Sequence, residues 1–128
     1  MSEVIQNSIL RAEGLAKSYR SGQRDIQVLL DVSLSLGKGE TVSIRGESGS
    51  GKSTLLNLLA GIETPDKGEI HWNGQSLLSL PEAQRPARRA SYLGFVFQAF
   101  YLIPELNTLE NVLLATRIAG TPYREGKA

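Results

Sequence analysis

The sequence predicts an α/β fold, and three observations lead to that prediction. Alternating β-forming residues open the chain at 9–13 and again at 28–36. A glycine-rich turn at 46–51 is followed at once by a leucine-rich segment of helical composition, 52–60. The chain has 128 residues, of which 41% are hydrophobic and 21% charged, so it is long enough for one globular domain with a buried core.

The glycine-rich turn has the pattern of a phosphate-binding loop. Residues 46–53 read Gly-Glu-Ser-Gly-Ser-Gly-Lys-Ser and match G-x-x-x-x-G-K-[ST] at every fixed position. Glycines without a Cβ allow positive φ and let backbone N–H groups turn toward an anion. Lys52 is placed to reach the β and γ phosphates, Ser53 offers a hydroxyl to Mg²⁺, and Thr54 lies within reach of a more distal phosphate. The predicted nucleotide site is Gly46, Glu47, Ser48, Gly49, Ser50, Gly51, Lys52, Ser53 and Thr54.

The segments around the loop fit this prediction. Residues 41–45 alternate β-formers and predict a strand that enters the loop. The helix at 52–60 is expected to stop at Gly61, and its leucines spread over more than one face, so we expect apolar cover on several sides.

The remaining elements follow from turn and capping signals. The sequence predicts a turn near Ser21-Gly22, a turn at 64–68, and a strand at 69–72 with a tight Asn73-Gly74 hairpin turn. It then predicts a short helix from Ser79 that Pro86 interrupts, a buried strand at 93–97 and a loop at 98–106. The last predicted element is a helix that begins with a capping box from Asn107 to Glu110 and ends near Gly120, with Pro122 closing it.

Composition excludes several classes of protein. There are no cysteines, hence no disulfides or thiolate metal sites. No run of about 18 apolar residues suggests a membrane span, and residues 1–10 do not have the pattern of a secretory signal. The net charge of +1 provides no general attraction to nucleic acid, so we expect no nucleic-acid partner.

A second motif, Leu93-Gly-Phe-Val-Phe-Gln at 93–98, joins the phosphate loop in a recognisable order. Together they resemble the nucleotide-binding subunit of an ATP-binding cassette (ABC) transporter. Segments that fall in that family's order are 14–20, 28–34, 39–40 and 59–61 through Gly74. Residues 97–112 look most like the branch that serves lipoprotein release, macrolide-type export and related permeases.

The resemblance implies a partial P-loop NTPase core with an antiparallel β subdomain, extending to about residue 97, and the start of a helical subdomain at 98–128. It implies that ATP and Mg²⁺ are the cofactors, that Tyr19 stacks on adenine, and that Gln98 contacts Mg²⁺ and the attacking water. The implied partners are a transmembrane permease and a second nucleotide-binding domain. The implied location is the cytoplasmic face of the inner or plasma membrane, held there by the permease, which would also carry specificity for the transported substrate.

The sequence departs from the family's pattern after Gln98. It has no Leu-Ser-Gly-Gly-Gln signature, no apolar run ending in Asp-Glu and no later switch histidine. The resemblance therefore implies that the chain is the front half of a cassette, through truncation, a split gene or an incomplete reading frame. Such a half cassette is expected to bind Mg·ATP without hydrolysing it.

Other interpretations remain open at this point. Another phosphate-loop enzyme is one, although the Asn-Lys-x-Asp base reader of a GTPase is absent. A soluble ABC protein and a non-catalytic nucleotide-binding module are two more.

His71, the sole histidine, is interpreted as a half-exposed strand residue, and residues 28–31 as an amphipathic strand. Arg85, Arg88 and Arg89 are interpreted as a solvated helix face, with permease or lipid headgroup contact as the alternative; Trp72 has no assigned role.

Overall fold

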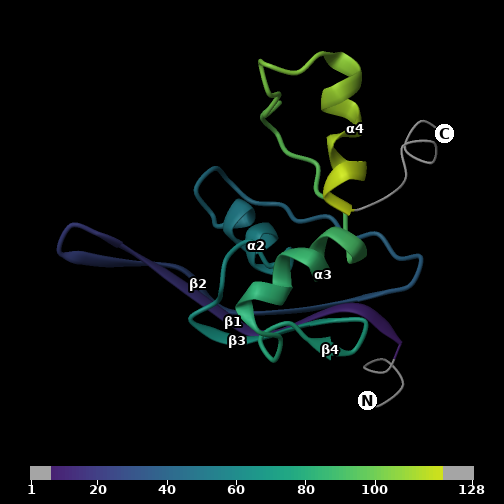
Figure 1. Ribbon diagram of the computed structural model, residues 1–128. Coiled ribbons are helices and arrows are strands. Elements are labelled where there is room, and N and C mark those ends of the chain that lie inside the picture. Colours follow the sequence, from purple (N-terminus) through teal and green to yellow (C-terminus); the bar gives the residue numbers. More distant parts are fainter. Residues whose placement is uncertain (1–6, 120–128) are drawn as a thin grey trace. The chain divides into compact units, whose positions relative to one another are not determined.

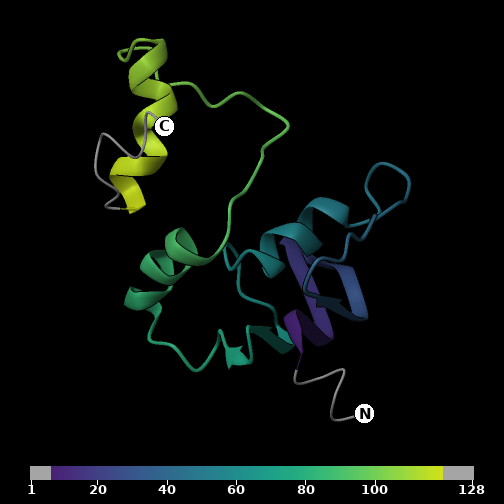
Figure 2. The same ribbon diagram turned by 90° about the vertical axis from the view of Figure 1, so that its right-hand side faces the viewer.

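The structure is a computed structural model, and it describes residues 7–119. The chain forms two compact units, Met1–Arg85 and Pro86–Ala128. Figure 1 and Figure 2 show their helices and strands. None of the helices in the described range is long and apolar enough to cross a membrane.

The first unit is built on an antiparallel sheet with the strand order β2-β1-β3-β4. The strands are β1 (Ser8–Ser21), β2 (Arg24–Gly37), β3 (Lys67–Trp72) and β4 (Gln75–Ser76). The predicted antiparallel β subdomain is thus confirmed. β1 and β2 are longer than the sequence suggested, because their pairing continues from the base of the hairpin to its turn.

Both hairpin turns lie where turn residues predict them. β1 and β2 meet at Gly22, which has a φ of 64°. β3 and β4 are joined by Asn73 and Gly74, with φ values of 50° and 81°. Positive φ at both central residues is the geometry that matches the twist of a two-residue hairpin, and Asn-Gly adopts it most readily.

The helix α2 (Lys52–Leu59) packs against this sheet and completes the core of the unit (Figure 2). The largest fully buried side chains come from β1, α2 and β3: Leu15, Leu58, Ile70 and Trp72. The indole Nε1 of Trp72 donates to the carbonyl oxygen of Leu59 at 2.9 Å, so β3 is bonded to the last turn of the helix. Burying one such side chain stabilises the fold by roughly 1.5–3 kcal/mol.

Two predicted strands are wrong. Residues 41–45 and 93–97 have no regular secondary structure. Val42 is 52% exposed and Val96 is 97% exposed, so neither segment is buried. The physical reason is that a strand exists only through its ladder of bonds with a neighbour, and no strand among residues 7–119 pairs with either segment.

The prediction that Pro86 interrupts a short helix is also wrong. A 3₁₀ turn, η1 (Glu82–Gln84), leads into α3 (Arg85–Tyr92), and Pro86 lies in the first turn of α3. Proline is tolerated there because the N–H it lacks would have no intrahelical partner. The three arginines of α3 are half-buried and do not form a solvated face. Arg85 donates to the carbonyl oxygen of Leu80, and Arg88 lies over the ring of Tyr92.

The last helix, α4 (Thr108–Ala119), begins with the predicted capping box. The backbone N–H of Glu110 donates to Asn107 Oδ1 at 2.8 Å, and the backbone N–H of Asn107 donates to Glu110 Oε1 at 3.2 Å. The capping box is therefore confirmed. The expected end near Gly120 and Pro122 lies outside the described residues.

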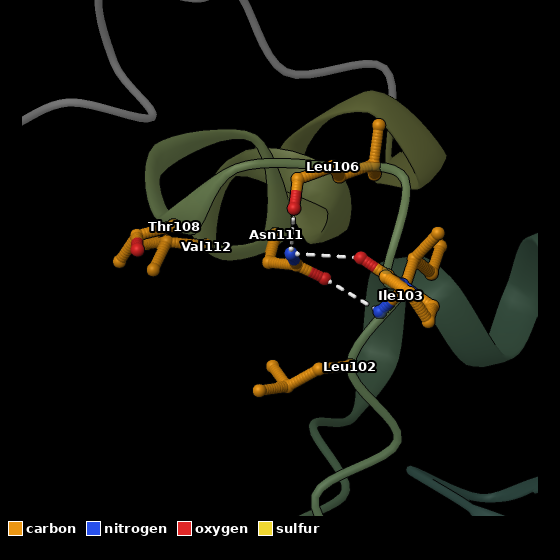
Figure 3. Close-up of a pocket in the computed structure, with 7 residues that line it drawn as sticks. Leu102, Ile103, Leu106, Thr108, Asn111 and Val112 are labelled. Carbon is orange, nitrogen blue, oxygen red and sulfur yellow. Dashed lines mark hydrogen bonds between the residues drawn. The ribbon is translucent and has the colours of Figure 1, made fainter.

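The side chain of Asn111 in α4 forms hydrogen bonds to the loop that precedes the helix (Figure 3). Its Oδ1 accepts the N–H of Ile103 at 2.9 Å, and its Nδ2 donates to the carbonyl oxygens of Ile103, Leu106 and Asn107. The loop and helix line a surface hollow of about 370 Å³ with apolar side chains, among them Leu102 and Val112.

Candidate nucleotide site

Gly51 joins the phosphate loop to α2 at a position where any side chain would be strained and crowded. It is the N-cap of the helix in a left-handed conformation, φ 95°. A Cβ there would lie 3.0 Å from Val28 Cγ1 and 3.1 Å from the Val28 carbonyl oxygen of β2. Its own carbonyl accepts the N–H of Leu55 at 2.9 Å, the first turn of the helix. Glycine thus permits both the turn and the close packing of loop on sheet.

The other two loop glycines serve different purposes. Gly49 has a φ of 82°, as expected from the motif. Gly46 does not have a positive φ, so it does not use the backbone freedom that the missing Cβ allows. What requires glycine at 46 is space, because a Cβ would lie 2.5 Å from Ser50 Oγ across the loop.

Lys52 folds across the loop. Its ammonium donates to the carbonyl oxygens of Gly46 and Glu47, the second at 3.0 Å. The cation is therefore held on the inner side of the turn by two backbone acceptors at the loop's start. An anion bound within the loop would meet this charge directly.

The N-terminus of α2 suits an anion. Gly51 makes no side-chain cap, and the first turn holds no acidic residue. The first N–H groups of a helix have no intrahelical acceptor and carry partial positive charge. Ser53 in this turn is exposed, as are residues 47–50 of the loop. Backbone donors, a lysine and an accessible hydroxyl are the groups that a Mg²⁺-bound polyphosphate needs, so these residues fit ATP with its metal.

Tyr19, the predicted adenine-stacking residue, lies on β1 and is half-buried. Its hydroxyl donates to Glu63 Oε2 at 2.6 Å. The ammonium of Lys17 lies over its ring, 5.4 Å from the centroid. The hydrogen bond to the Glu63 carboxylate, together with burial, raises the pKa of Tyr19. The ring is thus held at both its hydroxyl and one face.

The structure brings two predicted site residues together at this point. The Thr54 hydroxyl interacts with the Tyr19 hydroxyl, so the aromatic residue of β1 lies beside the first turn of α2. Gln98 belongs to the second unit, where it is exposed in the segment between α3 and α4.

Sequence reasoning missed the residues that hold Tyr19. Lys17 and Glu63 lie in segments that follow the family's order, but neither was given a role, and Tyr19 and Glu63 are 44 positions apart. The available signal was only that an acidic residue follows the glycine stop of the helix. Two tempting residues are not brought to the loop: His71 lies on β3 beside Glu69, 12% exposed rather than half-exposed, and Asp31 lies exposed on β2.

Comparison with known proteins agrees with this geometry. The model of the ABC transporter family matches residues 29–127, most of the chain. The chain belongs to the ABC transporter family. The predicted family resemblance and the predicted partial cassette fold are both confirmed.

Curated relatives come from several bacteria. The lipoprotein-releasing system ATP-binding protein LolD of Pseudomonas fluorescens is 45% identical over 95% of this chain and 54% of its own length. LolD of Xanthomonas axonopodis pv. citri is 44% identical over 94% of this chain and 50% of its own. An uncharacterised ABC transporter ATP-binding protein of Escherichia coli K12, YbbA, is 43% identical over 94% of this chain and 53% of its own length. The chain spans about half the length of these relatives.

Solved structures give the same family. The dimeric structure of the ATP-binding cassette MJ0796 in a post-hydrolysis state, bound to ADP and Pi, matches with a TM-score of 0.84. It is 36% identical, and the match covers 92% of this chain and 52% of that one.

Proposed function

We propose that this chain binds Mg·ATP through its phosphate loop and is the ATP-binding, energy-coupling component of an ABC transporter. The observation that carries the proposal is the loop itself. Lys52 is bonded to the start of the loop, the N-terminus of α2 has no side-chain cap, and Ser53 in its first turn is exposed. A family match over residues 29–127 supports the same function.

The site residues have distinct proposed roles. The N–H groups of residues 46–51 and the ammonium of Lys52 hold the phosphates, and Ser53 together with Gln98 holds Mg²⁺. The ring of Tyr19 stacks on adenine, and the Thr54 hydroxyl reaches a more distal phosphate. Bound ATP supplies a γ-phosphoryl group whose transfer to water releases free energy, and catalysis of such a transfer rests mostly on positioning and charge stabilisation.

We further propose that the 128-residue chain binds Mg·ATP but does not hydrolyse it. Hydrolysis needs a carboxylate or another group that orients water near the γ-phosphate, and removing such groups costs factors of about 10² to 10⁴. The acids near the motifs are already engaged or misplaced. Glu110 Oε1 accepts the N–H of Asn107 in the capping box, and Glu47 lies within the loop.

The proposed setting follows from the relatives. The similarity to LolD supports a role in lipoprotein release. Macrolide-type export stays the alternative that the resemblance at residues 97–112 implies. In that setting, residues up to about 97 form the β subdomain and phosphate core, and residues from 98 begin a helical subdomain that meets a transmembrane permease. Two nucleotide-binding domains would pair at the cytoplasmic face of the inner or plasma membrane; the dimeric MJ0796 cassette supports the pairing.

The test joins a thermal shift to a phosphate-release assay, both with Mg·ATP. We expect stabilisation of about 2.7 kcal/mol when ATP is present at about 100 times its dissociation constant, with no phosphate release. At the same ATP concentration, Lys52→Ala is expected to reduce the stabilisation to about 1.4 kcal/mol or less, because its affinity should be at least about tenfold weaker. Absence of a shift would refute nucleotide binding, and steady release dependent on Lys52 would refute the claim that the chain does not hydrolyse ATP.

A further inference from the structure

The segment that follows α2 is bonded to the part of β1 that carries Tyr19. The hydroxyl of Tyr19 donates to Glu63 Oε2 at 2.6 Å. The ammonium of Lys17 donates to the carbonyl oxygen of Thr64 at 2.8 Å and lies 3.8 Å from Asp66 Oδ1.

Backbone bonds reinforce the connection in both directions. The N–H of Ser18 donates to Asp66 Oδ2 at 2.7 Å, and the N–H of Asp66 donates to the carbonyl oxygen of Ala16 at 2.9 Å. Residues 16–19 of β1 therefore have partners throughout residues 63–66. We call this set of bonds the β1 clamp.

The clamp is attached to the phosphate loop through α2. The N–H groups of Ile62 and Glu63 donate to the carbonyl oxygen of Asn57 inside the helix, at 2.9 and 3.2 Å. Glu63 is thus fixed to the C-terminal turn of the helix whose N-terminus carries Lys52. A carboxylate at this position can orient the Tyr19 ring relative to α2, because the Glu63 backbone is bonded to the helix and the Glu63 carboxylate is bonded to the Tyr19 hydroxyl.

We infer that Glu63 is a positioning residue for the nucleotide base, which acts through the Tyr19 hydroxyl to hold the ring at a fixed place relative to the phosphate loop. This inference rests on the proposed function, in which Tyr19 meets the base. Nucleotide bound at the loop spans from the phosphates at the N-terminus of α2 to this ring. An aromatic ring that is already oriented loses less freedom when the base stacks on it. Lys17 lies over one face of the ring, so a base that stacks on Tyr19 would use the opposite face.

The test compares two ligands, Mg·ATP and Mg·tripolyphosphate, by calorimetry on the 128-residue chain. Tripolyphosphate occupies the phosphate loop without a base. Glu63→Ala is expected to weaken ATP binding by about three- to tenfold and to leave tripolyphosphate binding unchanged. A loss of folding would weaken both ligands together, so the difference between them reports positioning.

Companion variants separate the hydroxyl bond from the ring. Tyr19→Phe keeps the ring and removes the hydroxyl, so it should reproduce the effect of Glu63→Ala, and the double variant should be no weaker than either. Glu63→Gln keeps an oxygen acceptor and should bind ATP nearly as the unaltered chain does. Glu69→Ala, on β3, is the matched control and should change neither ligand.

The outcomes are distinguishable. For each protein we compare the affinity for ATP with the affinity for tripolyphosphate. If this ratio is the same in Glu63→Ala and in the unaltered chain, the inference is overturned, while the phosphate site stands. Losses that add in the double variant would also overturn it, since Glu63 would then act apart from Tyr19. Failure of the unaltered chain to bind either ligand would overturn the proposed function itself.

Discussion

The ammonium of Lys52 lies 3.0 Å from the carbonyl oxygen of Glu47, so the lysine of the phosphate loop is bonded to the loop it follows. It also donates to the Gly46 carbonyl oxygen. Neutral carbonyl acceptors bind a cation less strongly than phosphate oxygens do. A bound polyphosphate can therefore take over these bonds, and the lysine holds the loop's two ends near each other beforehand.

Replacing Lys52 by alanine should weaken Mg·ATP binding by at least about tenfold, because charged hydrogen bonds are worth roughly 1.5–3 kcal/mol each. Calorimetric titration measures the affinity. Lys38→Ala, which removes an exposed lysine next to β2, is the control and should bind normally. Equal affinity for Lys52→Ala and the unaltered chain, with folding intact, would disprove the phosphate-loop assignment.

Gly46→Ala should reduce nucleotide affinity through a contact inside the loop. The added Cβ would lie 2.5 Å from Ser50 Oγ and 3.2 Å from Ser50 Cβ, so the loop would have to shift. Removing the opposing side chain should relieve that contact. We expect Gly46→Ala/Ser50→Gly to bind Mg·ATP more tightly than Gly46→Ala alone. If the second substitution restores nothing, crowding by Ser50 is not the reason for glycine at this position.

Asn107→Ala should destabilise α4 by about 1 kcal/mol, the usual cost of a lost N-cap. Both bonds of the capping box depend on this residue and Glu110. Amide hydrogen exchange in the first turn of α4 measures the effect. Asn107→Asp retains a cap oxygen and serves as the control. Protection that stays the same in Asn107→Ala would contradict the role of the box.

Alkaline pH should weaken the bond between Tyr19 and Glu63. The Glu63 carboxylate and burial raise the pKa of Tyr19 above its ordinary value of 10.0, so the folded chain retains the phenolic proton where the unfolded chain loses it. The stabilisation is therefore complete below about pH 10 and is lost as pH rises through the folded-state pKa.

Denaturant melts of Tyr19→Phe against pH check this sign. The variant lacks the titrating hydroxyl, so it should be less stable than the unaltered chain at neutral pH, and the difference should shrink above pH 10. A difference that grows at alkaline pH would contradict the direction of the shift.

Substitutions of the leucines of α2 should affect stability differently on the buried and the exposed face of the helix. Leu58 is fully buried, and Leu58→Ala should cost about 2–5 kcal/mol. Leu56 is 45% exposed, so Leu56→Gln should change stability by no more than about 0.5 kcal/mol. Val42 and Leu56 are apolar yet exposed, and we expect the chain to self-associate through such surface.

Size-exclusion chromatography and a hydrophobic dye measure that association. Leu56→Gln should elute later at high concentration and bind less dye than the unaltered chain. A sharp monomeric peak for the unaltered chain, with no dye binding, would count against exposed apolar surface.

Local signals in the sequence predicted local features. The loop that leads to Lys52, the Asn73-Gly74 hairpin and the Asn107 capping box each depend on residues within a few positions of one another. The hairpin and the capping box are confirmed, because each is formed by residues within one turn of the chain. Helix α2 ends at Leu59 with Ala60 as its C-cap, and Gly61, the predicted stop, follows directly with a φ of 72°.

Features that depend on distant partners were harder to predict. Residues 41–45 have the composition of a strand, yet composition does not supply a neighbouring strand. Tyr19 could be named from the family resemblance, but its bond to Glu63 joins residues 44 positions apart. Only the folded arrangement of β1 against the end of α2 creates that pair.

The bond between Trp72 and Leu59 gives this protein an optical reporter. Trp72 is the sole tryptophan of the chain, 1% exposed, and its indole donates to the last turn of the phosphate helix. Intrinsic fluorescence excited at tryptophan therefore comes from one known place. A rigid, water-shielded indole emits at short wavelength, and solvent reaching it shifts the emission to the red. Loosening of α2 from the sheet can thus be followed in real time without attaching a label, in the same cuvette in which nucleotide is added.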